Sequence, residues 1–190
     1  MGEGSIIAAA GERTYSTRAG AVPAAIPFKG VEMGQRLHRY AVTLAWTGNT
    51  GTGTATHRGY ERAHVIRAAG KPDLPGSSDP AFRGDAARWN PEELLLASLC
   101  ACHQLWYLSL CAEAGVVVTA YEDAAEGEMV EEADGAGRFV RATLHPRVTV
   151  TANSDAAAAA ALHDRAHAMC FIARSVAFPV EHRATIVRSE

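Results

Sequence analysis

The chain has 190 residues, of which 48% are hydrophobic and 21% charged, and a formal net charge of −3 at pH 7. These values are typical of a soluble globular domain, and they exclude a wholly disordered or fibrous chain and a general nucleic-acid-binding role. No run of about eighteen apolar residues stands out, so we expect no membrane-spanning helix. Residues 1–35 show little periodicity and no signal-peptide pattern, so we expect a poorly ordered tail or extension before one domain at 36–190.

Strand-forming residues at 37–47 and 54–67 surround a glycine-rich turn and predict two strands. Residues 68–90 are rich in Gly, Pro, Asp and Ser and predict a loop of more than twenty residues. Loops of this length in compact domains are usually functional or mobile.

The strongest predicted helix runs from Pro91 to about Ala114. Asn90 is a good N-cap, Pro91 suits the first helical position, and Gly115 ends the pattern. The helix is apolar almost all round, which is typical of the centre of a fold or of an oligomer interface.

The second half of the chain predicts further strands and one more helix. The strands are expected at 116–121, with a solvated acidic continuation over 122–132, and at 138–152, where Pro146 marks a bulge or an edge. A helix from Asp155 to about Arg174 and a closing strand at 179–188 follow. Runs of strands broken by two helices predict an α+β fold.

The four cysteines are the most informative residues. They are too few and too clustered for a secreted disulfide scaffold, so we expect a cytoplasmic protein with reactive or buried thiols. Cys102 lies within the first helix and Cys170 near the end of the second. Cys111 follows Cys102 by nine residues, about 900° of helix rotation, and Cys100 is about 200° away, so both face elsewhere. A buried cysteine is usually a small inert hydrophobe, and we assign Cys100 and Cys111 to that role.

Two segments resemble a known family. Residues 89–110, WNPEELLLASLCACHQLWYLSL, resemble the NPEEL and AC helix of the OsmC/Ohr proteins, the osmotically induced and organic-hydroperoxide-resistance peroxidases. Residues 166–176, AHAMCFIARSV, resemble the second motif of that family. The resemblance covers roughly residues 37–188. It implies an OsmC-like fold of antiparallel strands with two central hydrophobic helices in an intertwined homodimer.

The resemblance also implies a reaction. Cys102 would be the peroxidatic thiol and Cys170 the resolving thiol of an organic hydroperoxide reductase. The Cys102 thiolate would become a sulfenic acid and then a Cys102–Cys170 disulfide, which an external dithiol would reduce. No organic cofactor or metal is implied.

The family activates its thiol with an arginine and a glutamate. Glu92 occupies the glutamate position, but it lies ten residues, about 15 Å, from Cys102 along one helix. A shared site therefore requires a partner subunit or a long arginine, and the alternative is that Glu92 only favours the helix N-terminus. The turn WTGNTG lacks the arginine of the hydroperoxide-resistance branch. Arg83 is the first candidate for the cation, and Arg58 and Arg62 are the reserves, with an ordinary surface role equally open for each.

Apolar residues are expected to form the substrate pocket and to favour a lipophilic peroxide. They are Phe82, Leu99, Trp106 and Phe171. His103 follows Cys102, and His167 precedes Cys170 by three residues and could polarise it, although a structural role is the commoner one.

Two other functions stay open. Cys100, Cys102, His103, His167 and Cys170 contain zinc ligands in number, but two thiols within C-A-C-H on a helix diverge, which disfavours a structural zinc site. A non-enzymatic OsmC-like dimer that binds a ligand or senses redox state is the second alternative, since a fold does not fix a chemistry.

Overall fold

The computed structural model describes residues 36–189, so the tail predicted at residues 1–35 lies outside the described residues. The chain divides into two units, residues 1–42 and residues 43–190. In the first unit, the described residues 36–42 form no helix or strand.

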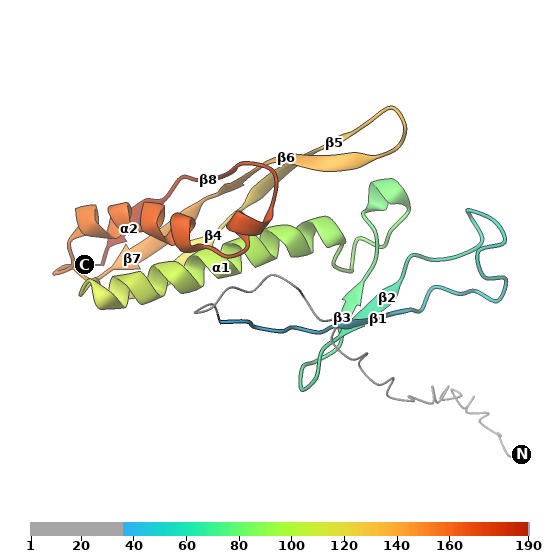
Figure 1. Ribbon diagram of the computed structural model, residues 1–190, viewed down its shortest axis with the longest axis horizontal. Coiled ribbons are helices and arrows are strands. Elements are labelled where there is room, and N and C mark those ends of the chain that lie inside the picture. The colour runs from blue at the N-terminus through green and yellow to red at the C-terminus, as the bar shows by residue number, and fades with distance from the viewer. Residues whose placement is uncertain (1–35, 190) are drawn as a thin grey trace, which may run out of the picture. The chain divides into compact units, whose positions relative to one another are not determined.

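Within residues 43–189, the second unit contains nine strands, two α-helices and two short 3₁₀ helices (Figure 1). This composition confirms the predicted α+β class. The strands are β1 (Thr43–Trp46), β2 (His64–Arg67), β3 (Leu74–Gly76), β4 (Val118–Asp123), β5 (Glu126–Glu131), β6 (Gly137–Leu144), β7 (Pro146–Val150), β8 (Val180–His182) and β9 (Thr185–Arg188). The helices are α1 (Pro91–Glu113) and α2 (Ala156–Met169), with the 3₁₀ helices η1 (Pro80–Phe82) and η2 (Ala173–Ser175).

The described strands form three sheets, in the orders β1-β2-β3, β4-β7-β9 and β5-β6-β8. Most pairings are antiparallel, as predicted, but β6 pairs with β8 and β7 with β9 in parallel. The expectation of antiparallel strands is wrong for these two pairings. Parallel neighbours need a crossover connection, and α2 provides it because it lies between β7 and β8 in the chain.

The strand predicted over 138–152 is in fact two strands in different sheets. Its break lies at His145, whose N–H donates to the Asp123 carboxylate at 2.7 Å instead of to a neighbouring strand. Pro146 then begins β7, a position that suits a residue without an N–H. The closing strand predicted over 179–188 is likewise divided into β8 and β9.

The predicted first helix is confirmed as α1. The Asn90 side chain accepts from the N–H of Glu93 at 2.7 Å, and the Glu93 carboxylate accepts from the N–H of Asn90 at 3.2 Å, which is a capping box. Gly115, just past the helix, has a φ of 72°, a conformation that favours glycine. By length and composition α1 could cross a membrane, contrary to our expectation from the sequence, but in the structure it packs against α2 and β4.

The second helix ends earlier than predicted. It stops at Met169, and Cys170 is the C-cap residue with extended backbone angles of −66° and 112°. The expectation of a helix to Arg174 is therefore wrong. The backbone turns at Cys170 and continues as η2, and the N–H of Ala173 donates to the Cys170 sulfur at 3.4 Å.

The core has two parts, and α1 contributes to both. Tyr107 and Leu110, in the C-terminal half of α1, pack with α2 and with the inner residues of sheet β4-β7-β9. Leu99, in the N-terminal half, packs against Ala142 and Leu144 of β6. Figure 1 shows α1 and α2 running side by side. Along α1, Cys102 lies between the residues that contribute to the two parts of the core.

Candidate functional site

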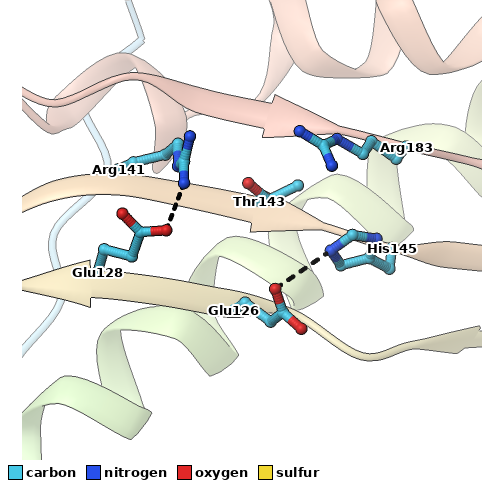
Figure 2. A pocket seen from close by; sticks show the side chains of 6 residues that line it. All are labelled: Glu126, Glu128, Arg141, Thr143, His145 and Arg183. Carbon is cyan, nitrogen blue, oxygen red and sulfur yellow. Dashed lines mark hydrogen bonds and ion pairs between the residues drawn. The ribbon is translucent and has the colours of Figure 1, made fainter.

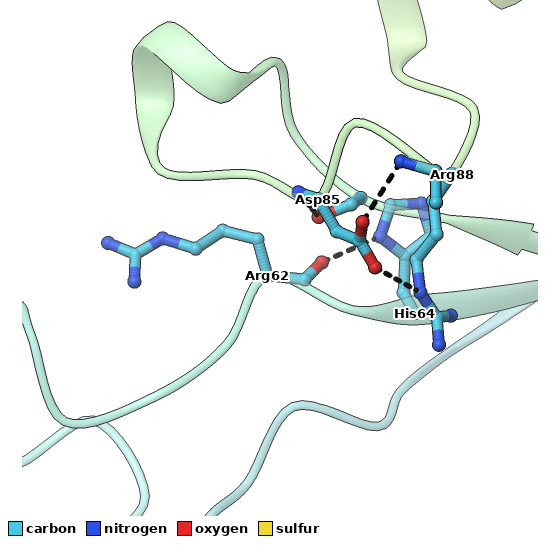
Figure 3. A network of polar contacts seen from close by, with 6 residues as sticks. Arg62, His64, Asp85 and Arg88 are labelled. Atoms are coloured by element: carbon cyan, nitrogen blue, oxygen red, sulfur yellow. Dashed lines mark hydrogen bonds and ion pairs between the residues drawn. The ribbon is translucent and has the colours of Figure 1, made fainter.

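The segment before α1 is anchored by a polar network (Figure 3). The Asp85 carboxylate accepts from Nε of Arg88 at 3.2 Å, and the N–H of Asp85 donates to Oγ of Ser77 at 3.1 Å. The buried Ser77 donates its own N–H to the carbonyl of Trp89 at 2.9 Å. These bonds tie the loop to the start of α1 and fix how the chain enters that helix.

The three candidate arginines of the sequence line one cavity of about 570 Å³. Arg58, Arg62 and Arg83 are all on its wall. The Arg62 guanidinium donates to the carbonyls of Tyr60 and His57 at 2.7 and 3.0 Å, and it lies 4.2 Å from the centre of the Tyr60 ring. The other two candidates, Arg58 and Arg83, therefore share a concave surface with a guanidinium group that is already held in place, and Arg88 lines the same cavity.

Arg83 has the most unusual backbone of the three. Within residues 36–189 it is the only non-glycine residue with a positive φ, 68°. Its N–H donates to the carbonyl of Pro80 at 3.0 Å, which closes η1. None of the ion pairs within the described residues engages its guanidinium. Backbone strain of this kind concentrates at functional sites, where neighbouring structure maintains it.

Cys102 and Cys170 are brought together from α1 and from the end of α2. Both are free thiols, Cys102 half-buried and Cys170 buried. Burial raises the pKa of the Cys170 thiol, and the neighbouring Cys102 thiol raises it further. The more accessible thiol of the pair is therefore the one that the resemblance assigns to attack on the peroxide.

An aromatic pair lies beside the two thiols. Trp106 follows Cys102 by one helical turn, and Phe171 directly follows Cys170. Their rings meet edge to face, with centroids 5.5 Å apart. Of the other two predicted pocket residues, Phe82 is 42% exposed in η1, whereas Leu99 is fully buried in the core. The position of Leu99 favours a packing role.

Glu92 lies at the start of α1, where its Oε2 atom is buried without a hydrogen-bond partner among the described residues. Neither Glu92 nor Cys102 is on the wall of the arginine cavity. Within the described chain, therefore, the predicted arginine, glutamate and thiol do not form one site.

The other two cysteines have separate surroundings. Burial raises the pKa of the Cys100 thiol to about 11, and the nearby Asp123 carboxylate adds to this. Burial also raises the pKa of Cys111, which lies beside Tyr107 in the core. Both positions are on faces of α1 away from the Cys102–Cys170 pair.

His103 and His167, which the sequence indicated singly, belong to a cluster with His163 and His182 that the sequence did not predict. Nε2 of His103 lies 2.9 Å from Nδ1 of His163, and both side chains are fully buried. His167 and His182 lie close to this pair. A signal was present, because His163 and His167 are four residues apart and so share one face of α2.

A second, smaller cavity of about 60 Å³ lies on sheet β5-β6-β8 (Figure 2). Arg141 is paired with Glu128 across it, and His145 lies 3.8 Å from Glu126. It contains none of the predicted site residues. Among residues 36–189, no group of three or more His, Cys, Asp or Glu side chains could hold a metal ion, so the zinc alternative finds no site there.

Comparison with known proteins identifies a family and several solved structures with a similar fold. The family model described as OsmC-like protein matches residues 84–184. An OsmC-like protein of unknown function from Vibrio cholerae is 26% identical, with a TM-score of 0.71 over 78% of this chain and 100% of that one. An organic hydroperoxide resistance protein from Elizabethkingia anophelis is 15% identical, with a TM-score of 0.59 over 82% and 99% of the two chains. OhrB, the organic hydroperoxide resistance protein of Bacillus subtilis, is 20% identical, with a TM-score of 0.54 over 80% and 99%. No curated protein matches the sequence.

The fold and the matched segment define a protein of the OsmC-like class. The chain belongs to the OsmC-like family. The family model includes α1, α2 and both cysteines of the thiol pair.

Proposed function

We propose that this chain is a thiol-dependent peroxidase that reduces organic hydroperoxides. The observation that carries the proposal is the half-buried Cys102 thiol beside the buried Cys170 thiol, at the contact between α1 and the end of α2. Structural neighbours named for organic hydroperoxide resistance support the same reaction class.

The reaction has three balanced steps. The Cys102 thiolate attacks the O–O bond, which breaks to leave a Cys102 sulfenic acid and an alkoxide that takes up a proton as the alcohol. The Cys170 thiolate then attacks the sulfenic sulfur and the Cys102–Cys170 disulfide forms, while the leaving hydroxide takes up a proton as water. A small or protein-bound dithiol reduces this disulfide by exchange and restores both thiols.

The activating cation and carboxylate are proposed to come from a partner subunit. A thiolate needs a nearby cation to form readily at neutral pH, and no arginine of the cavity is placed beside Cys102 in one chain. In a homodimer, the partner subunit's Arg83 and the partner subunit's Glu92 would complete the site. Exposed apolar side chains on β1 and α1 support such a dimer, since Leu44 is 62% and Leu105 is 67% exposed.

The aromatic pair supports an apolar substrate. Trp106 and the 64% exposed Phe171 place apolar surface next to the thiols. Apolar surface favours the organic part of an alkyl or aryl hydroperoxide over hydrogen peroxide. A cytoplasmic location, without a nucleic-acid or membrane partner, is part of the same proposal, because the reaction requires reduced thiols at rest.

The experiment is a coupled turnover assay with cumene hydroperoxide and dithiothreitol. The wild type and Cys111→Ser should turn over, Cys102→Ser should be inactive, and Cys170→Ser should lose cycling while its Cys102 is still oxidised. Absence of wild-type turnover would contradict the enzyme. Oxidation of Cys102 without turnover would instead favour the non-enzymatic redox-sensing dimer. The turn at 46–51, which lacks an arginine, is the sequence feature that favours this alternative.

A further inference from the structure

Four histidines from three elements form a cluster, and two of them, His103 and His167, lie within three residues of Cys102 or Cys170 in the sequence. The ring centroid of His182, at the end of β8, lies 5.6 Å from that of His103 on α1. It lies 5.9 Å from His163 and 5.8 Å from His167, both on α2. The cluster therefore connects the helix that carries Cys102 with the helix that leads to Cys170.

The central contact of the cluster is the hydrogen bond between His103 and His163. One imidazole must donate and the other must accept, so at least one of them is neutral while this bond exists. The outer atoms, Nδ1 of His103 and Nε2 of His163, are buried and have no partner within the described residues. In the neutral pair, one imidazole N–H is used in the bond between the rings. The other imidazole N–H has no acceptor among the described residues.

A carboxylate reaches the cluster only at its edge. Asp164, on α2, lies 3.2 Å from Nε2 of His182. On α1, the group facing the pair is Tyr107, whose ring stacks on His163. The other ionisable groups that act on the pair are His167 and His182, and neither supplies a negative charge.

The neighbours on β8 are also occupied elsewhere. Glu181 and Arg183 flank His182 in the strand and lie 3.6 Å from each other. Burial lowers the pKa of His103 to about 4 and that of His163 to about 3, and the other histidines of the cluster add to both shifts. A first proton on the pair would bury an unpaired charge, and a second would remove the acceptor and break the bond.

We propose that the neutral His103–His163 pair positions Cys170 against Cys102, and that protonation of the pair separates the two thiols. His103 directly follows Cys102, and α2, which carries His163, ends at the residue before Cys170. A bond between the two imidazoles therefore fixes the two thiols relative to each other. The role of this contact in catalysis rests on the proposed function, whereas the contact between the two imidazoles is observed in the structure.

The test compares the wild type with a double variant that keeps the contact between residues 103 and 163 but has no imidazole to protonate there. His103→Gln places an amide nitrogen near the position of Nε2, and His163→Asn places an amide oxygen near the position of Nδ1. The double variant can make the same contact and takes up no proton. His103→Ala removes the contact, and His57→Gln, at an exposed histidine outside the cluster, is the matched control.

Two readouts are measured, and neither uses a peroxide. The first is the rate at which diamide converts Cys102 and Cys170 to their disulfide at pH 7, with diamide reduced to its hydrazine. His103→Ala should slow this rate by about tenfold, the effect of one lost buried hydrogen bond, and the double variant should restore it. An unchanged rate in His103→Ala would overturn the proposal.

The second readout is the fluorescence of Trp106, which reports its contact with Phe171, in a background with Trp46→Phe and Trp89→Phe. The wild-type contact should be lost as the pH falls to about 4 and below, where His103 takes up a proton. His57→Gln should match the wild type, and the double variant should keep the contact to a lower pH. The same midpoint in the double variant would overturn the proposal. If that variant does not fold, NMR of the histidine rings in the wild type tests the proposal instead. Titration of His103 and His163 near pH 6.5 with the Trp106–Phe171 contact intact would also overturn the proposal. Peroxidase turnover in the same preparations tests the proposed function separately.

Discussion

The ring of Tyr107 lies flat against the ring of His163, with centroids 3.8 Å apart and planes 13° from parallel. The Tyr107 hydroxyl also donates to the carbonyl of Ala159 at 3.1 Å. Together these contacts bind the middle of α1 to α2 in the buried core.

Tyr107→Phe keeps the stacked ring and removes the buried hydroxyl. We expect the free energy of unfolding to fall by about 1 kcal/mol, the net contribution of one hydrogen bond. Tyr107→Ala should cost about 3 to 5 kcal/mol, because it also leaves a cavity where a fully buried ring was. Urea unfolding followed by circular dichroism measures both. Equal losses in the two variants would show that the ring packing contributes little.

Stability should depend on pH through the buried histidines. Both have an ordinary pKa of 6.5, which burial lowers to about 4 in His103 and about 3 in His163. As the pH falls below 6.5 the unfolded chain takes up protons that the folded chain does not, so the stability present above 6.5 is lost towards pH 4 and 3. At about 1.4 kcal/mol per pH unit, each histidine removes about 2 kcal/mol between pH 7.5 and pH 5. Urea unfolding at these two pH values measures the loss, and a loss as large in the double amide variant would contradict its assignment to this pair.

Arg83→Gly separates activation of the thiol from folding. Glycine accepts the left-handed backbone at this position, so relief of about 1 kcal/mol of strain offsets the similar entropy cost of glycine. We expect unchanged thermal stability and a loss of kcat/KM with cumene hydroperoxide of at least tenfold. Arg58→Ala is the comparison. If Arg58→Ala alone lowers the rate, the cation is Arg58 and the assignment of Arg83 is wrong.

Two adjacent glutamates form a matched pair for testing the predicted carboxylate. Glu93 serves the capping box through its side chain, and glutamine can replace it there. Glu92 makes no such bond, and its Oε2 is buried without a partner among the described residues. Glu92→Gln should lower kcat/KM at least tenfold, whereas Glu93→Gln should leave it unchanged. Equal rates in both variants would leave Glu92 with a role at the helix terminus alone.

The first helix was predictable because its signals are local. Asn90, Pro91 and Gly115 stand at the positions where caps are needed, and a capping motif acts within a few residues of the chain. The end of α2 was not predictable, because Cys170 leaves the helix without a proline or glycine to mark it. The division at His145 depends on Asp123, a residue far away in the sequence, and no local pattern reports such a contact.

The candidate site shows the same limit. The sequence indicated Cys102 and Cys170 by their motifs, and the structure places these two thiols side by side. It missed the bond between His103 and His163, because two histidines sixty residues apart meet only when α1 packs on α2. The cavity that joins Arg58 to Arg83 likewise depends on how two loops approach each other.

The central claim is that Cys102 and Cys170 form a redox pair driven by an organic hydroperoxide. The most direct measurement is peptide mapping by mass spectrometry after the reduced protein reacts with one equivalent of cumene hydroperoxide. We predict one disulfide, between Cys102 and Cys170, with Cys100 and Cys111 still reduced. A protein that stays fully reduced, or a disulfide that involves Cys100 or Cys111, would contradict the claim.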